Sequence, residues 1–126
     1  MTKQEAEEFI QRYFSALRRD KSEATLNEFI NEEPLRQHIA YFEAVFPGYW
    51  FETKDVLADG DEIAVRMMIH GTHKGELMGI PPTGKTVIFE GIIIYRLADG
   101  KIIDHWMQVD TTSVMQQIGT MAAVNA

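Results

Sequence analysis

Residues 87–110 read VIFEGIIIYRLADGKIIDHWMQVD, and this stretch decides the fold. Two apolar runs flank Ala98-Asp99-Gly100, which is typical of a tight hairpin turn because glycine adopts positive φ without strain. We therefore predict an antiparallel hairpin with one strand over residues 87–97 and the other over residues 101–110. Charged and aromatic residues recur at even spacing in these strands, as the wall of a ligand pocket requires.

Side chains alternate across a strand, so the hairpin has two distinct faces. Simple pairing about the turn predicts that Ile94 lies near Asp104 and that Ile92 lies near Trp106. The first face then holds Ile88, Glu90, Ile92, Ile94, Arg96, Asp104, Trp106, Gln108 and Asp110. The second face holds Phe89, Ile93, Tyr95, Ile103, His105, Met107 and Val109. A β-bulge would exchange these assignments on one side of the bulge.

Both faces are too apolar for open water, so we expect helices on one and a second copy of the chain on the other. This predicts a homodimer through the sheet. An upstream strand over residues 63–71 shows the same division, with an apolar side and a mixed side that carries Arg66, Met68 and His70. A further strand is expected over residues 49–57, before the turn at residues 59–61. We predict that the mixed sides line a common cavity.

The first third of the chain predicts helices. Its apolar residues recur at intervals of three and four, as on an amphipathic helix: Phe9, Ile10, Tyr13, Phe14 and Leu17. Ser22 is suited to cap a short second helix, and Pro34 is suited to the first turn of a third. A short helical turn is expected over residues 113–118. Helices followed by antiparallel strands indicate an α+β domain in which the helices cover one face of a curved sheet.

Composition limits the classes of function. The 126 residues have room for one domain, residues 1–126, with one core. The formal net charge of -7 argues against nucleic-acid binding, and the absence of cysteine excludes disulfides and thiolate chemistry. The opening residues lack a signal-peptide pattern, and no apolar run has the length of a membrane span. We therefore expect a cytoplasmic protein without a membrane segment.

Asp110 is the first candidate for chemistry, because an aspartate beside Trp106 in an apolar cavity would exchange protons near neutral pH. The alternative is that Asp110 caps the turn that follows it, since aspartate is a preferred N-cap. His70 is the second candidate and could orient a substrate carbonyl. As a lone strand histidine, it could equally be a hydrogen-bonded structural residue. His105 falls on the opposite face, where an interface role is expected.

Glu90 lies between isoleucines, and a buried glutamate must either have a charged partner or act in the site. Arg66 is either that partner or a residue that binds an anionic ligand. Arg96 and Asp104 are expected to form an ordinary charge pair. Trp106, Glu90 and Arg66 are therefore candidate substrate contacts. Several aromatic residues of the helical part are more often core residues than ligand contacts, but three of them are also candidates for the cavity wall: Tyr13, Tyr41 and Phe42. No histidine has a partner at metal-ligand spacing, so no metal site is expected.

The sequence resembles the SnoaL-like polyketide cyclase (ester cyclase) group of the nuclear-transport-factor-2-like superfamily. The resemblance runs from about His38 to Gly119 and rests on these motifs: Phe46-Pro47-Gly48, the stretch GTHKGELMGIPPTGK at residues 71–85, RLADGKI at residues 96–102, Asp104-His105-Trp106 with Asp110, and Gln117-Ile118-Gly119.

The resemblance implies a cone-shaped α+β half-barrel that encloses an apolar pocket, in a homodimer. It also implies that an aspartate late in the sheet acts as acid and base in an intramolecular aldol ring closure on a polyketide ester, without metal or organic cofactor. Asp110 matches that aspartate. The assisting histidine of the family has no match, because Glu90 or Arg96 occupies the comparable stretch.

From these observations we expect cofactor-independent acid–base chemistry on a small hydrophobic carbonyl compound, by aldol-type cyclisation or isomerisation. The alternative is a non-catalytic binding protein that uses the same pocket. A third hypothesis is a purely structural dimerisation domain.

Overall fold

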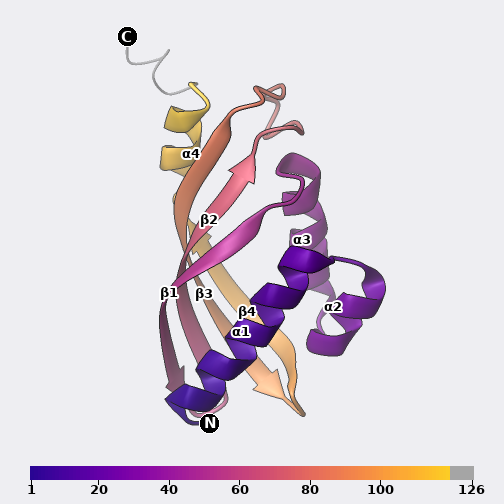
Figure 1. Cartoon of the computed structure of the whole chain (residues 1–126), viewed down its shortest axis with the longest axis vertical. Helices are drawn as coiled ribbons and strands as arrows, with labels where there is room; N and C mark the ends of the chain where they lie inside the picture. The colour runs from indigo at the N-terminus through magenta and orange to yellow at the C-terminus, as the bar shows by residue number, and fades with distance from the viewer. Residues whose placement is uncertain (120–126) are drawn as a thin grey trace.

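The computed structural model describes residues 1–119, which fold into four helices and four strands. In chain order these are α1 (Lys3–Arg19), α2 (Glu23–Phe29), α3 (Glu33–Val45), β1 (Trp50–Asp59), β2 (Glu62–Thr72), β3 (Thr86–Ala98), β4 (Lys101–Val109) and α4 (Thr111–Gln117). Among the described residues, no helix is long and apolar enough to cross a membrane. The predicted α+β class is confirmed (Figure 1).

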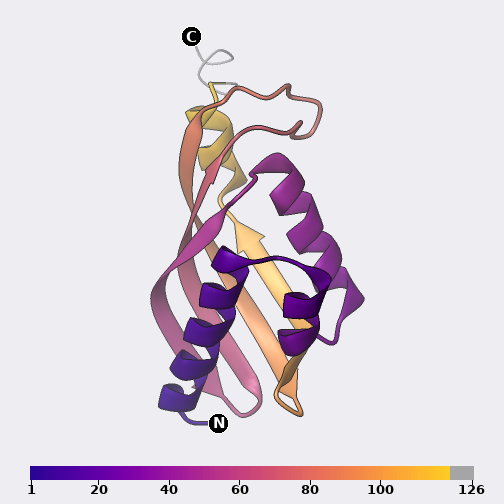
Figure 2. The ribbon, with the colours of Figure 1, turned by 45° about the vertical axis from the view of Figure 1, so that its right-hand side comes forward.

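The strands form one antiparallel sheet in the order β1-β2-β3-β4, so each strand pairs with its neighbour in sequence. The sheet is curved and does not close. Figures 1 and 2 show α1 lying across one face of the sheet, with α2 and α3 on the same side. We call this covered face the inner face and the opposite one the outer face.

The helix ends follow the signals in the sequence. Ser22 caps α2 by accepting a hydrogen bond from the backbone nitrogen of Thr25, and Pro34 lies in the first turn of α3, as predicted. Thr2 and Glu5 form a capping box at the start of α1. The buried side of α1 carries Phe9, Ile10, Tyr13, Phe14 and Leu17. The predicted amphipathic helix is therefore confirmed.

The β3–β4 hairpin has a different register from the predicted one. Ile94 pairs with Trp106 rather than Asp104, and Ile92 pairs with Gln108 rather than Trp106. Two features cause the change: the loop holds only Asp99 and Gly100, and a bulge interrupts the pairing between Arg96 and Leu97. Together they shift the pairing by two residues, so the side chains beyond the bulge keep the predicted faces.

Ile103 is the exception. It lies at the bulge and is exposed, whereas Ile102 takes the buried position beside it. The prediction that Ile103 shares a face with the buried residues of the hairpin is therefore wrong, because the extra residue interrupts the alternation.

The prediction of which face of the sheet lines the cavity is wrong, and this is the main difference between the predicted and the observed fold. Both predicted sets of side chains exist, but the helices cover the apolar set and leave the mixed set exposed. The buried residues of the inner face include Ile63, Val65, Met67, Ile69, Phe89, Ile93 and Tyr95. The exposed apolar residues of the outer face include Ile88, Ile92, Ile94 and Trp106. Burying the more apolar face removes more hydrocarbon from water, which explains the choice.

The loop between β2 and β3 is anchored on the end of α3. The backbone nitrogens of Lys74 and Gly75 both donate to the carbonyl oxygen of Val45, each at 3.0 Å. The approach is so close that a Cβ atom at position 75 would lie 1.9 Å from the carbonyl oxygen of Ala44. His73, the first residue of this loop, is fully buried, and its Nδ1 lies 3.0 Å from Oγ1 of Thr83 in the same loop. The predicted rigid loop is therefore tied to α3.

Candidate functional site

Arg66 and Glu90 are partners on the outer face. Nη1 of Arg66 lies 3.1 Å from Oε2 of Glu90, and its Nε lies 2.6 Å from Oδ2 of Asp55. The hydrogen bonds from Asp55 and then Glu90 raise the pKa of the Arg66 guanidinium. The side chains of Arg66, Asp55 and Glu90 are 41%, 60% and 49% exposed. The predicted pairing is thus present, but neither residue lines a cavity under the helices, because both lie on the outer face.

His70 also lies on the outer face. Its Nε2 lies 2.9 Å from Oε1 of Glu52, and its ring stacks on Trp50 with centroids 4.1 Å apart. The hydrogen bond from His70, followed by the one from Lys54, lowers the pKa of the Glu52 carboxyl. These contacts match the structural interpretation of His70. It does not face the space under the helices.

Asp110 ends β4 and begins α4. Its Oδ1 accepts a hydrogen bond from the backbone nitrogen of Ser113 at 3.0 Å, so it is the N-cap of α4. Asp110 and Glu90 border a shallow depression of about 170 Å³ that lies on the outer face and is open to solvent. Among the described residues, Asp110 does not lie in the apolar cavity that was predicted for it, because the helices cover the other face of the sheet.

Trp106 is 46% exposed on the outer face, with the Arg96 guanidinium carbon 5.2 Å from its ring centre. The expected charge pair of Arg96 with Asp104 is replaced by one with Glu62, at 3.4 Å between Nη2 and Oε2. Trp106 does not share a cavity with Asp110. The prediction that the mixed faces of the strands line a common cavity is wrong, because helices α1–α3 pack on the opposite side.

A small, partly enclosed cavity lies between the helices and the inner face. Its lining comes from α1, α3, the residue before β1 and the inner sides of the strands: Tyr13, Leu35, His38, Ile39, Phe42, Tyr49, Phe51, Ile93, Tyr95 and Met107. In this conformation the space open to the centre of a water molecule is about 10 Å³. That is enough for about one water molecule.

Two of the three predicted aromatic contacts belong to this cavity. Tyr13 and Phe42 line it, whereas Tyr41 is 49% exposed. A helix turns by about 100° per residue, so Phe42 shares the inner side of α3 with Ile39 while Tyr41 points away from it. The expectation that Tyr41 lines the cavity is therefore wrong.

Three buried tyrosines give the cavity its polar character. Burial is the main cause that raises the pKa of Tyr13, Tyr49 and Tyr95. The pKa of Tyr13 is raised further by Tyr95, that of Tyr49 by Glu43, and that of Tyr95 by Tyr49. The rings of Tyr13 and Tyr95 meet edge to face with centroids 5.8 Å apart. At neutral pH these phenols are uncharged, and each can donate a hydrogen bond.

A chain of three side chains reaches the edge of the same cavity. Nδ1 of His105 lies 2.8 and 2.9 Å from the two carboxylate oxygens of Glu32, and Nε2 of His105 lies 2.9 Å from Nδ1 of His38. The side chains of His105 and Glu32 are only 4% and 10% exposed. His38 lines the cavity and is itself accessible to solvent. The expected interface role of His105 is wrong, because this side chain points inward.

Sequence patterns gave little indication of this cluster. Glu32 and His105 are separated by 73 residues, and His38 and His105 by 67. The one usable signal was strand alternation, which grouped His105 with the residues that the helices cover. Within residues 1–119, no group of histidine, aspartate and glutamate side chains has an arrangement suited to a metal ion.

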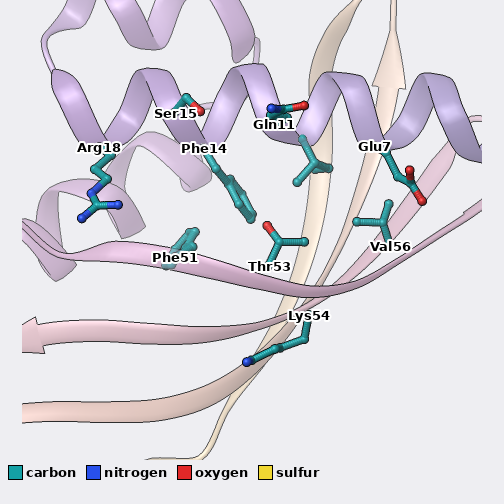
Figure 3. A pocket seen from close by; sticks show the side chains of 10 residues that line it. Glu7, Gln11, Phe14, Ser15, Arg18, Phe51, Thr53, Lys54 and Val56 are labelled. Atoms are coloured by element: carbon teal, nitrogen blue, oxygen red, sulfur yellow. The ribbon is translucent and has the colours of Figure 1, made fainter.

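A second, larger hollow lies between α1 and β1 and has a volume of about 420 Å³ (Figure 3). Glu7 and Arg18 lie at its two ends, while Lys54 points away on the far side of the strand (Figure 3). Phe51 lines both this hollow, which we call the groove along α1, and the cavity under the helices. The centroids of the Phe51 and Phe14 rings are 4.9 Å apart. These two rings therefore separate the groove from the interior.

Comparison with known proteins gives the family. The model of the SnoaL-like polyketide cyclases matches residues 5–118. The nogalonic acid methyl ester cyclase of Streptomyces nogalater is 33% identical over 60 residues, which are 48% of this chain and 45% of that protein. The aklanonic acid methyl ester cyclase DnrD of Streptomyces peucetius is 34% identical over 61 residues, which are 48% of this chain and 42% of that protein. The matched part spans less than half of each relative.

Solved structures show the same fold over more of the chain. A SnoaL-like polyketide cyclase from Agrobacterium tumefaciens has a TM-score of 0.76 and 21% identity, and the match covers 94% of this chain and 100% of that one. Likeness at this level of identity shows the fold, while the chemistry depends on the residues of the site.

Proposed function

The chain belongs to the SnoaL-like polyketide cyclase family, and from this premise we propose that it promotes cofactor-independent acid–base chemistry on a small hydrophobic carbonyl compound. The proposed substrate class is a polyketide ester: the family description names polyketide cyclases, and the names of the two relatives are those of methyl ester cyclases. The reaction is an aldol-type cyclisation or isomerisation. A proton leaves the carbon next to a carbonyl, that carbon attacks a second carbonyl, and the new alkoxide takes up a proton.

The observation that carries the proposal is the partly enclosed, mostly apolar cavity between α1, α3 and the inner face. Apolar walls exclude water and strengthen electrostatic interactions inside the cavity. Neutral phenols from Tyr13, Tyr49 and Tyr95 can donate to a substrate carbonyl, where negative charge develops during the reaction. A carbonyl compound is therefore suited to this lining, whereas a charged ligand is not.

Binding requires the cavity to open. A drug-sized ligand occupies a few hundred cubic ångströms, far more than the space of one water molecule. Phe51 and Phe14 divide the interior from the groove along α1, so movement of Phe51 would join the two spaces. In this proposal Tyr13 and Phe42 form walls of the site. Asp110, His70, Trp106, Glu90, Arg66 and Tyr41 have no role in it, because they do not line the cavity.

The test uses the methyl esters of nogalonic and aklanonic acid as substrates. Cyclisation conserves mass, so the product is an isomer that liquid chromatography separates from the substrate. Met107→Phe fills the cavity and should abolish both binding and conversion. Lys101→Phe is the control, since this exposed side chain at the start of β4 lies away from the cavity. Binding without any isomer would indicate a carrier protein and would contradict the proposed reaction.

We propose, in addition, that two copies associate through the outer face. The large apolar side chains exposed there include Ile88, Ile92, Ile94 and Trp106. Arg66 lies among them between the acidic groups of Asp55 and Glu90. A two-fold axis brings each patch against its own copy, so a patch with both signs of charge can be complementary to itself.

A further inference from the structure

We propose that His38 is the general base of this site, and that Glu32 and His105 are positioning residues that hold its Nε2 atom free of a proton. The proposal rests on the proposed function, because it names the proton acceptor for the same cavity. The observations behind it are the hydrogen-bonded chain Glu32–His105–His38, the burial of its first two members, and the position of His38 at the cavity wall.

The tautomers follow from the hydrogen bonds. An ionised carboxylate only accepts hydrogen bonds, so Nδ1 of His105 must carry the proton that lies between it and Glu32. In neutral His105, Nε2 is then an acceptor, and the hydrogen bond at 2.9 Å requires a proton on Nδ1 of His38. Neutral His38 therefore has its lone pair on Nε2, where a base needs it.

The burial of Glu32 determines where the positive charge lies after His38 takes up a proton. The side chain of Glu32 is almost out of contact with solvent, and a buried carboxylate is costly unless a charge or hydrogen bonds compensate it. When Nε2 of His38 takes up a proton, the Nδ1 proton can pass to Nε2 of His105. The positive charge then lies beside the carboxylate of Glu32. Return of the proton to the substrate alkoxide restores two uncharged histidines beside the ionised Glu32, so the cycle has no net change in protons.

The other titratable groups near Glu32, His105 and His38 do not alter this assignment of protons. Tyr13 from α1 and Tyr95 from β3 are buried phenols with a raised pKa, so they are neutral. Arg36 from α3 donates to the carbonyl oxygen of Ile30 and to Asn27, away from the histidines. Asp104 accepts from the backbone nitrogen of His105. Glu32 is the carboxylate that holds the ring of His105.

His38→Gln should lower kcat for the methyl esters by roughly 10²- to 10⁴-fold, the usual contribution of a general base, with little change in KM. Added imidazole should restore part of the rate to His38→Ala, since His38 is accessible to solvent. Glu32→Gln and His105→Asn should each lower kcat by about 10-fold or more without responding to imidazole. Gln37→Ala, on the exposed side of α3, is the control and should retain the rate.

Nitrogen NMR of the imidazole rings, without any ligand, separates the two proposals. If neutral His38 carries its proton on Nδ1, and becomes a mixture of tautomers in Glu32→Gln, the positioning of His38 by Glu32 and His105 is supported even if no methyl ester is converted. The absence of conversion, and of deuterium exchange next to the ester carbonyl, would then count against the proposed function alone. A proton on Nε2 of neutral His38 overturns the inference. A rate for His38→Gln within twofold of the wild type also overturns it.

Discussion

The carboxylate of Asp110 accepts a hydrogen bond from the backbone nitrogen of Ser113 at 3.0 Å, and this contact makes Asp110 the N-cap of α4. The backbone nitrogen of Asp110 in turn donates to the carbonyl oxygen of Glu90 at 2.9 Å. Asp110 therefore connects the edge strand β4 to both β3 and α4.

Asp110→Ala should lower the free energy of unfolding by about 1 kcal/mol, the usual effect of losing an N-cap side chain. Asp110→Asn should retain most of the stability, since asparagine caps almost as well. Urea unfolding measures both. Conversion of the methyl esters by Asp110→Asn at the wild-type rate would exclude Asp110 as the acid–base group. Loss of turnover at unchanged stability would instead restore the hypothesis derived from the sequence.

Gly75→Ala should destabilise the fold by about 2 kcal/mol or more, because its Cβ would overlap the carbonyl oxygen of Ala44 and force the loop away from α3. Thermal unfolding measures the loss. Lys74→Ala is the control, since its exposed side chain can be removed while its backbone hydrogen bond to Val45 remains. A Gly75→Ala variant as stable as the control would contradict the close packing of this loop.

Alkaline solution should destabilise the protein through its three buried tyrosines. Burial raises the pKa of Tyr13, Tyr49 and Tyr95 in the folded state, so the unfolded chain releases these protons first. Their contribution is fully present below about pH 10, the ordinary value for tyrosine, and is lost as the pH rises above it. Each phenol lowers the free energy of unfolding by up to about 1.4 kcal/mol per pH unit.

Urea midpoints between neutral pH and about pH 11.5 measure this slope, while ultraviolet absorbance follows the phenolates. Tyr95→Phe should reduce the slope by about one group's share. Ionisation of all three phenols before the unfolding transition would contradict their burial.

Ile92→Lys should separate the proposed dimer, because it puts a charge in the middle of the exposed apolar patch. Light scattering after gel filtration should give twice the mass of the chain for the wild type and the mass of one chain for the variant. Glu8→Gln on α1 changes the net charge by the same amount and should stay dimeric. A wild-type protein that is monomeric at high concentration would rule out the dimer.

The sequence predicted the fold well because the fold depends on periodic patterns. The spacing of Phe9, Tyr13 and Leu17 defined α1, and strict alternation in β2 and β3 separated the two faces. Ser22 and Pro34 marked helix starts through local chemistry that needs no tertiary contact.

The site was predicted less well because it depends on quantities that a linear pattern does not contain. Alternation defines two faces but does not say which one the helices cover, so the face that carries Trp106 and Asp110 was wrongly expected to line the cavity. The contact between His38 and His105 joins a helix to a distant strand, and only the packing of α3 on the sheet creates it. Tyr13 and Phe42 were found because their helices have one clear apolar side.

The bulge at Arg96 and Leu97 has an evolutionary consequence. It decides which side chains of β4 face the helices. If β3 and β4 paired without this bulge, Asp104 and Trp106 would point toward the helices, and His105 would point toward solvent. A shift of one residue in this register therefore exchanges two complete sets of chemical groups. Residue roles in related proteins should for this reason be compared by strand face rather than by aligned position.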